Sequence, residues 1–271
     1  MDLVSILIRT CQRPNVLRRA LESVQNQTYK NIEVVVVEDG IESARTLIET
    51  EFKDLNIVYY PTIEKKGRSY AGNKAMEIAH GKYLNFLDDD DILYPEHVEL
   101  LVKVLDGCKN KAAYAIAEEA MVTASGIIKK VFVRYQQPYN RILLTTMNYF
   151  PIQTVLFERT LFEEKGGFDE KIDMMEDWDL WLRFSTETDF KYLEKITSRY
   201  YTPAEKRKKQ NRSSELRETR EYIIGKMEKY TFESNIASVN KEAMYLLREY
   251  NQNPIVKYLR ILARLIIWGE K

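Results

Sequence analysis

The chain has 271 residues and a mass of 32.0 kDa, and its 45% hydrophobic residues suffice for a globular protein of one large domain or one domain with an appendage. The 41 basic and 41 acidic residues cancel, which argues against a protein that neutralises many nucleic-acid phosphates. Cys11 and Cys108 have neither metal-ligand spacing nor a disulfide pattern, so they favour a reducing, cytoplasmic location. No signal peptide is predicted, and no stretch reaches transmembrane length.

The first half of the chain predicts an α/β fold, because apolar runs rich in Val and Ile alternate with segments of helical period. Near-continuous apolar strands separated by helices imply a parallel sheet that is covered on both faces. The expected strands span 3–8, 32–37, 57–60, 82–87 and 112–117, and the expected helices begin at Pro14 and span 69–79 and 96–105.

The polar residues with the most chemistry stand where these strands end. In an open parallel sheet, ligands bind outside the carboxyl ends of the strands. We therefore expect residues 10–13, 38–40 and 88–91 to lie on one rim of the sheet.

Residues 88–91 are four consecutive aspartates. Like charges this close raise one another's pKa values, so the cluster needs a compensating cation or open water. The period of a strand would send Asp88 and Asp90 to one side, which is a chelating geometry for a hard divalent ion that carries phosphate oxygens. The alternative is a solvated loop in which Asp90 or Asp91 caps the next helix. The cluster alone leaves both interpretations open.

From about Met121 onward the regular alternation breaks into short β-like pieces, at 127–135 and 154–157, a pattern that is common where a second substrate binds. A second acidic block begins a helix at Glu176 and Asp177. Residues 203–213 form a polar, basic link, and helices follow over about 214–230 and 235–250.

Seven short motifs stand in one order along the chain, and together they resemble the inverting nucleotide-sugar glycosyltransferases of family 2, with the GT-A fold, over roughly residues 3–202. The motifs are the segments 4–14, 23–29, 37–40, 67–73, 86–91, 166–170 and 176–177. The resemblance implies a Rossmann-like, mostly parallel central sheet flanked by helices, with a C-terminal helical appendage. The implied domains are 1–202, with a nucleotide-sugar-binding half at 1–120 and an acceptor-binding half at 121–202, and the basic linker and C-terminal helices at 203–271.

The resemblance also implies a donor site. It assigns the nucleoside to Thr10, Cys11, Arg13, Glu38 and Asp39. A carboxylate at a strand end suits this task, because it accepts a hydrogen bond from a uracil N–H or a ribose hydroxyl; a polar turn at 38–40 is the alternative.

The next segment in the same resemblance lies close to the donor and contributes Gly67, Arg68 and Asn73. A helix that begins near Ser69 directs its backbone N–H groups toward an anion, and the guanidinium of Arg68 is expected to donate two hydrogen bonds to the diphosphate. An ordinary strand-to-helix turn is the alternative interpretation.

The resemblance assigns different roles to the four aspartates. Asp88 and Asp90 become an Asp-x-Asp pair, with Asp90 the direct ligand of a divalent metal, Mn or Mg, and Asp89 nearer the sugar or ribose. Such a metal stabilises the charge that develops on the departing nucleoside diphosphate. Asp91 is left to cap the following helix.

The acidic block supplies the base. By the same resemblance Asp177 removes the proton of the acceptor hydroxyl, and Glu176 raises its pKa or orients the acceptor. The alternative is that both carboxylates cap a helix and complement its dipole. Trp178 and Gln153 are the predicted acceptor contacts, although Trp178 and Trp181, three residues apart, are more typical of a core.

Three positions depart from the family pattern. The family commonly has Pro where Arg9 stands, Arg where Gly72 stands and a metal-binding His near Tyr201. We therefore expect one protein carboxylate, the diphosphate and water to hold the metal, with Arg9 or Arg68 taking over the charge lost at Gly72 and with weaker metal dependence. His80 and His97 are interpreted as structural or surface residues.

The expected activity is transfer of a hexose-type residue from a nucleoside diphosphate donor, a UDP-sugar by preference, to a hydroxyl of a glycan or lipid-linked glycan in bacterial cell-surface polysaccharide biosynthesis. A sugar-phosphate nucleotidyltransferase is one alternative, although residues 8–14 lack its glycine-rich phosphate loop. A non-catalytic carbohydrate-binding or scaffold protein of the same fold is the other.

No nucleic-acid partner is expected, and the oligomeric state, a homo-oligomer included, is left open. Residues 254–268 have a basic and an apolar side, so they lie in the interface of the inner face of the plasma membrane or pack on the domain or a second subunit. The link at 206–212 is attracted to anionic lipid, folds over the donor as a lid or is solvated.

Overall fold

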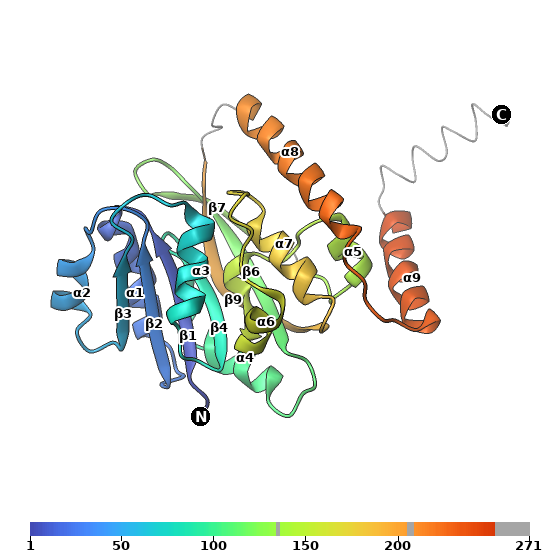
Figure 1. Ribbon diagram of the computed structural model, residues 1–271, viewed down its shortest axis with the longest axis horizontal. Helices are drawn as coiled ribbons and strands as arrows, with labels where there is room; N and C mark the ends of the chain where they lie inside the picture. Colours follow the sequence, from blue (N-terminus) through green and yellow to red (C-terminus); the bar gives the residue numbers. More distant parts are fainter. Residues whose placement is uncertain (134–135, 205–208, 253–271) are drawn as a thin grey trace. The chain divides into compact units, whose positions relative to one another are not determined.

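The fold is described from a computed structural model, in which residues 1–133, 136–204 and 209–252 are placed (Figure 1). Their contacts form two units. The main unit comprises Met1–Tyr139 and Asn148–Thr231, and the small unit comprises Asn140–Met147 and Phe232–Lys271. The domain boundary expected after residue 202 stays a prediction, and the amphipathic segment expected at 254–268 lies outside the described residues.

The first half of the main unit is the predicted parallel α/β array. Its strands are β1 (Val4–Thr10), β2 (Ile32–Glu38), β3 (Ile57–Pro61) and β4 (Tyr83–Asp88), arranged in the order β3-β2-β1-β4 with every neighbour parallel. The helices α1 (Pro14–Gln25), α3 (Arg68–Ile78) and α4 (His97–Leu105) were predicted, and the short α2 (Arg45–Glu51) was not.

The second half continues the same sheet with mixed directions. β8 (Val155–Glu158) is antiparallel to β4 and to β6 (Ala112–Val122), and β9 (Phe190–Pro203) runs parallel to β6. β5 (Ile92–Leu93) is antiparallel to β9, and β7 (Ile128–Val133) is antiparallel to β6. The 3₁₀ turn η1 (Ile152–Thr154) and the helices α6 (Arg159–Lys165), α7 (Glu176–Phe184) and α8 (Lys209–Met227) complete the unit, and α8 starts within the segment expected as a link.

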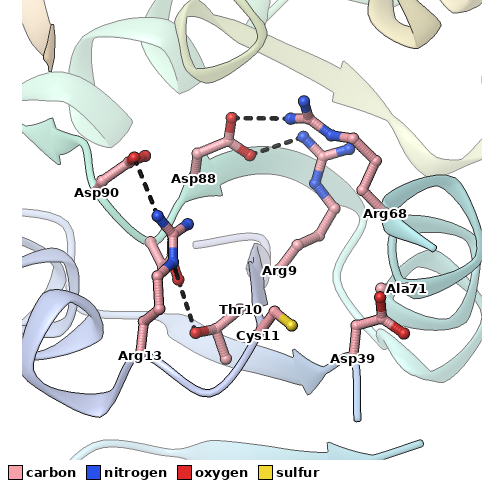
Figure 2. Close-up of a pocket in the computed structure, with 10 residues that line it drawn as sticks. Arg9, Thr10, Cys11, Arg13, Asp39, Arg68, Ala71, Asp88 and Asp90 are labelled. Atoms are coloured by element: carbon pink, nitrogen blue, oxygen red, sulfur yellow. Dashed lines mark hydrogen bonds and ion pairs between the residues drawn. The ribbon is translucent and has the colours of Figure 1, made fainter. Parts of the chain in front are cut away.

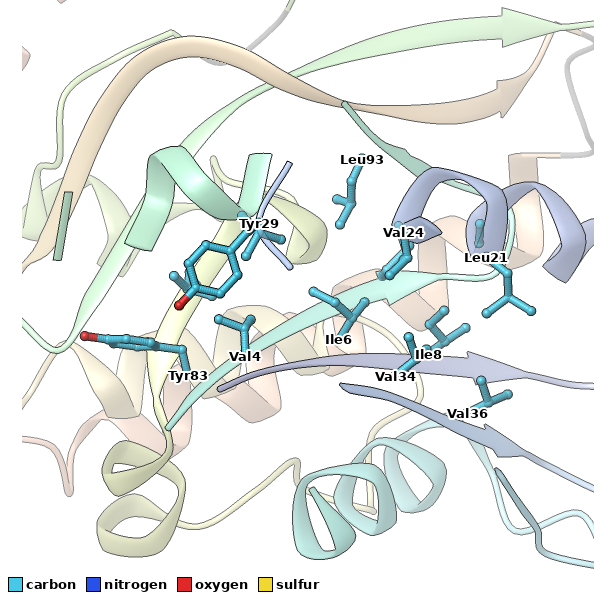
Figure 3. Close-up of a cluster of buried hydrophobic side chains, with 14 of the residues drawn as sticks. Val4, Ile6, Ile8, Leu21, Val24, Tyr29, Val34, Val36, Tyr83 and Leu93 are labelled. Atoms are coloured by element: carbon cyan, nitrogen blue, oxygen red, sulfur yellow. The ribbon is translucent and has the colours of Figure 1, made fainter. Parts of the chain in front are cut away.

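The strand period separates the two faces of the sheet. Val4, Ile6 and Ile8 of β1 pack with Val34 and Val36 against apolar side chains of α1 (Figure 3). The residues between them point to the face covered by α3, and this alternation places Arg9 on the α3 side while Thr10 faces the other way.

The second half has an aromatic core. Trp181 has no exposed surface, and its ring centroid lies 5.9 to 6.2 Å from those of four phenylalanines. Trp181 is therefore a core residue, as its spacing from Trp178 suggested. Its four neighbours are Phe150, Phe157, Phe184 and Phe190.

The small unit pairs α5 (Arg141–Thr146) with α9 (Ile236–Gln252). Asn140 caps α5 by accepting from Leu143 N at 2.8 Å, and its amide donates to the carbonyl of Glu242 on α9 at 3.0 Å. In the described part of the chain, no helix has both the length and the apolar character needed to cross a bilayer.

Candidate active site

A pocket of about 300 Å³ opens where the parallel strands end (Figure 2). Three sequence-distant segments meet in it, after β1, β2 and β4, as the parallel arrangement predicted. The rim expected from the sequence is thereby confirmed as a real concave site. Its lining residues are Arg9, Thr10, Cys11, Arg13, Asp39, Arg68, Ala71, Asp88, Asp89 and Asp90.

The four aspartates lie in four different surroundings, because the strand ends at Asp88 and the chain then turns. The N–H of Asp91 donates to the carbonyl of Asp88 at 3.0 Å and closes this turn. The strand period therefore stops at Asp88. Asp88 and Asp90 both line the pocket, but they contact different arginines.

Asp88 belongs to a closed ring of four charged side chains. Its Oδ1 accepts from Nη2 of Arg9 at 2.7 Å and its Oδ2 from Nη2 of Arg68 at 3.2 Å. Oε1 of Glu176 lies 2.9 Å from Nη1 of Arg9 and 3.0 Å from Nε of Arg68. Burial opposes ionisation of Asp88, but the charges of Arg9 and Arg68 outweigh it and hold the pKa of Asp88 below its usual value.

Asp89 has no exposed surface and faces β1. It accepts from Oγ1 of Thr10 at 2.7 Å and from Nε of Arg13 at 3.1 Å. Burial, together with the charges of its two neighbours, raises the pKa of Asp89 to about 6, although Thr10 and Arg13 favour its ionised form. Asp90 is the open member, since its side chain is 45% exposed and lies 3.5 Å from Nη1 of Arg13.

The helix cap expected of Asp91 is wrong. Asp91 is buried and its Oδ1 accepts from the backbone N–H of Tyr201 on β9 at 3.1 Å, while the residue before α4 is Glu96. Burial raises the pKa of Asp91 well above its ordinary value. At the position where the family places a histidine, the ring of Tyr201 lies 3.9 Å beneath the guanidinium of Arg19.

The two carboxylates after β2 have different tasks. Asp39 lines the pocket while its two oxygens accept from the backbone N–H groups of Lys66 and Gly67, at 2.6 and 3.1 Å. Glu38 has no exposed surface and accepts from the N–H of Ser43 at 2.9 Å. Burial raises the pKa of Glu38, but hydrogen bonds outweigh it and the net shift is downward. Glu38 does not line the pocket and its Oε2 accepts from the N–H groups of Ser43 and Ala44, which argues against the predicted nucleoside contact of Glu38.

Asn73 also acts structurally here. Its Oδ1 accepts from the N–H of Phe168 at 2.6 Å and its Nδ2 donates to the carbonyl of the same residue at 3.0 Å. These bonds tie α3 to the loop at 166–170. Neither Asn73 nor Gly67 lines the pocket, although Gly67, at φ 103°, forms the turn that presents Arg68.

The acidic block begins α7. Asp177 accepts from Nδ2 of Asn148 at 2.8 Å. Burial, followed by the charge of Glu176, raises the pKa of Asp177 to about 7. The expectation that Glu176 raises the pKa of its neighbour therefore agrees with the geometry. Met175, just before the helix, has φ 58°, an uncommon left-handed conformation for a side chain of this size.

The predicted acceptor contacts lie inside the protein. Trp178 has no exposed surface and Gln153 is 1% exposed. Burial therefore argues against direct acceptor contact by either residue.

Sequence reasoning missed Asn148, whose bond to Asp177 joins residues 29 apart in sequence. Sequence reasoning also missed that Arg9 lies between the carboxylates of Asp88 and Glu176. A single charged residue at the end of an otherwise apolar strand was the pattern that could have indicated it.

A divalent ion is implied by the family, and the lining residues fit it in part. In the described residues, no three His, Cys, Asp or Glu side chains converge as a metal site. Both oxygens of Asp88 are engaged by arginines, whereas the side chain of Asp90 is 45% exposed and its Oδ2 lies 3.5 Å from Nη1 of Arg13. One protein carboxylate therefore suits an ion whose other ligands are diphosphate oxygens and water.

The comparison with protein families decides the family. The model described as glycosyl transferase family 2 matches residues 5–164. The chain belongs to this family. Among curated relatives, an uncharacterized glycosyltransferase of Rickettsia typhi is 31% identical in an alignment of 189 residues that covers 67% of this chain and 58% of that protein. Glycosyltransferase GlyA of Streptococcus pneumoniae is 37% identical over 103 residues, which are 38% of this chain and 15% of that protein. The chain thus spans little more than half of the Rickettsia protein.

Solved structures confirm the GT-A fold. S. aureus TarS residues 1–349 in complex with UDP superposes with a TM-score of 0.66 at 16% identity, covering 93% of this chain and 72% of that one. The complex of the same protein with UDP-GlcNAc gives a TM-score of 0.65 at 16% identity and covers 92% of this chain and 73% of that one. At this identity the likeness concerns the fold.

Proposed function

We propose that this member of glycosyl transferase family 2 is an inverting enzyme. It moves a hexose-type residue from a nucleoside diphosphate donor to a hydroxyl of a glycan or lipid-linked glycan. One observation carries this proposal. A charged pocket at the strand ends is joined, through Arg9, Arg68 and Glu176, to a carboxyl group whose pKa is raised toward neutrality. A site that only bound carbohydrate has no need for such a base.

The base is Asp177. In its ionised form it accepts the proton of the acceptor hydroxyl as that oxygen attacks the anomeric carbon, and the bond to the nucleoside diphosphate breaks on the opposite face. The configuration inverts because one displacement occurs and no covalent intermediate with the protein forms. The proton remains on Asp177, the electron pair leaves with the diphosphate, and bulk water resets the base.

The donor lies against the pocket lining. We assign the nucleoside to the side formed by Thr10, Cys11, Arg13 and Asp39, where polar groups line the cavity. Arg68 is the arginine for the diphosphate, since its side chain is 44% exposed and its guanidinium is already at the pocket. A UDP-sugar is the favoured donor because TarS, a structural neighbour, has been solved in complex with UDP and with UDP-GlcNAc.

A divalent ion, Mn²⁺ or Mg²⁺, accompanies the donor in this proposal, with Asp90 as its protein ligand. When bound, it neutralises charge on the leaving diphosphate. Asp89 orients Thr10 and Arg13 beside it, a role that follows from its hydrogen bonds. We further propose a cytoplasmic location and a cell-surface glycan pathway, which rest on the family alone.

Nucleoside diphosphate release tests the activity. Purified chain is incubated with UDP-, GDP- and dTDP-sugars, Mn²⁺ and water or simple glycans, and free nucleoside diphosphate is measured. We expect release from at least one donor. Asp177→Asn should lower transfer by roughly 10²- to 10⁴-fold and leave donor binding intact, whereas Asp106→Asn, an exposed carboxylate beyond α4, should be neutral.

The outcomes separate the alternatives. Release of pyrophosphate from a nucleoside triphosphate and a sugar phosphate would identify a nucleotidyltransferase. Binding of glycans without turnover of any donor by the folded protein would identify a carbohydrate-binding protein and end the transferase proposal.

A further inference from the structure

Arg9 occupies an unusual place for a charge. Its side chain is 5% exposed, whereas that of Arg68, which contacts the same two carboxylates, is 44% exposed. Arg9 reaches Asp88 through Nη2 and Glu176 through Nη1, so its two terminal nitrogens bridge residues of β4 and α7. A buried arginine with two carboxylate partners is held in one geometry by the fork of its guanidinium.

The surroundings of Arg9 are built to hold its stem. The guanidinium carbon lies 5.4 Å from the ring centroids of both Phe86 and Phe168. A Cβ atom at Gly72 would lie 3.3 Å from Cδ of Arg9 and 2.4 Å from a ring carbon of Phe168. The bare backbone at Gly72 therefore makes room for the ring of Phe168 and for the arginine beside it.

We propose that Arg9 is a positioning residue: it holds the start of α7, and with it the base Asp177, in place relative to Asp88 at the donor rim. The absence of a side chain at Gly72 leaves the space that Arg9 occupies. The inference rests on the proposed function and names a residue that acts through Glu176 and Asp88 and does not touch the reacting atoms.

The physical reason lies in how α7 begins. Glu176 is its first residue and Asp177 its second, so a shift of the Glu176 carboxylate moves the base with it. Removing Arg9 leaves Glu176 with the more exposed Arg68 alone, whose long side chain is free to turn to solvent or to the donor diphosphate. A displacement of about 1 Å at a reacting group costs about 10²-fold in rate.

The test is a double-mutant cycle on kcat with Arg9→Met, Glu176→Gln and the two combined, measured at the pH of maximal rate. We expect each single variant to lose about 10²-fold in kcat and the double variant to lose little more, because both remove one link. Arg9→Lys should fold with the charge retained but recover little of kcat, since one ammonium group does not reproduce the bridging fork.

Donor affinity is read separately from turnover. Cys11 lines the pocket, so in a Cys108→Ser background the donor nucleotide protects a single thiol from alkylation, and the protection gives its dissociation constant. We expect this constant to change little in Arg9→Met, which places the loss in kcat.

A matched control variant is Arg199→Met, because Arg199 donates from Nε to Glu118 at 2.8 Å in an ion pair that is part-buried and outside the pocket. This control should keep kcat even where its melting temperature falls as far as that of Arg9→Met.

Three results would overturn the role of Arg9: multiplicative losses in the double variant, full kcat in Arg9→Lys, or a loss in Arg9→Met no larger than in Arg199→Met. Absence of donor turnover by the wild-type chain, or of nucleotide protection at Cys11, is a different result and counts against the proposed function itself.

Discussion

The sharpest consequence of the site geometry concerns the pH at which Asp177, the proposed base, loses its negative charge. Asp177 must be ionised to accept a proton, and burial beside Glu176 raises its pKa to about 7. Below that pH the ionised fraction falls about tenfold per unit, so at pH 5 the rate should be about 1% of its plateau. An ordinary aspartate would still be almost fully ionised at pH 5.

The perturbation is Glu176→Gln. It removes the negative charge that, after burial, contributes most to raising the pKa of Asp177. The acidic limb of the kcat profile should therefore move to lower pH, even though the plateau rate also falls. Asn148→Ala should move the limb the other way, because the amide of Asn148 donates to the carboxylate and favours its ionised form.

The assay measures initial rates of nucleoside diphosphate release between about pH 5 and pH 9 at saturating donor, where kcat reports groups of the bound complex. Glu77→Gln removes an exposed carboxylate of α3 and should leave the limb in place. A wild-type profile that stays flat from pH 5 to 7, or a limb that rises to higher pH in Glu176→Gln, would refute this assignment of the base.

Three further outcomes are expected. Asp90→Ala should weaken the Mn²⁺-dependent part of UDP binding in calorimetry and leave binding without metal nearly unchanged, because Asp90 is the open carboxylate of the rim. Gly72→Ala should lower the melting temperature, since the new methyl meets Phe168 at 2.4 Å, whereas Gly225→Ala, with nothing within 4 Å, should keep or raise it as helix propensity predicts. Burial lowers the pKa of His97 to about 3, so as the pH falls the imidazole is protonated in the unfolded chain before it is protonated in the folded one. The contribution of His97 to the free energy of unfolding should therefore fall by about 1.4 kcal/mol per pH unit from about pH 6.5 toward 3, and His97→Gln should remove this contribution in urea titrations.

The rim of the site could be predicted from the sequence because parallel strands impose it. Once β1, β2 and β4 are recognised as buried, apolar and separated by helices, Thr10, Asp39 and Asp88 must meet at the same edge. The same local signals placed α1, α3 and α4 to within one or two residues. β9 was missed because its polar, half-exposed sequence shows no clear alternation, and its long pairing with β6 stabilises it instead.

The partners of individual side chains could not be predicted, because they depend on register and on distant loops. Arg9 and Glu176 are 167 residues apart in sequence and touch only in the folded chain. Asp91 was expected to cap a helix, yet the turn after β4 carries it to the backbone of β9. Glu38 and Asp39 are adjacent, chemically alike and both buried, and only the fold decides that Asp39 lines the pocket while Glu38 is turned to internal hydrogen-bond partners.

The charge of the pocket bears on whether the donor arrives with a metal. The lining contains three arginines and four aspartates, so it is slightly negative when all are ionised, and a diphosphate adds more negative charge. Arg9 is buried between its two carboxylates, whereas the side chains of Arg13 and Arg68 are 49% and 44% exposed and are the cations of this lining able to turn toward the donor. When Arg68 turns away, Asp88 and Glu176 lose one of their two counterions. A divalent ion on the open Asp90 would offset that loss, so metal dependence should be coupled to the freedom of Arg68 to move. Arg68→Met should therefore make donor binding more dependent on Mn²⁺. If arginine alone neutralises the diphosphate, Arg68→Met would show no such change.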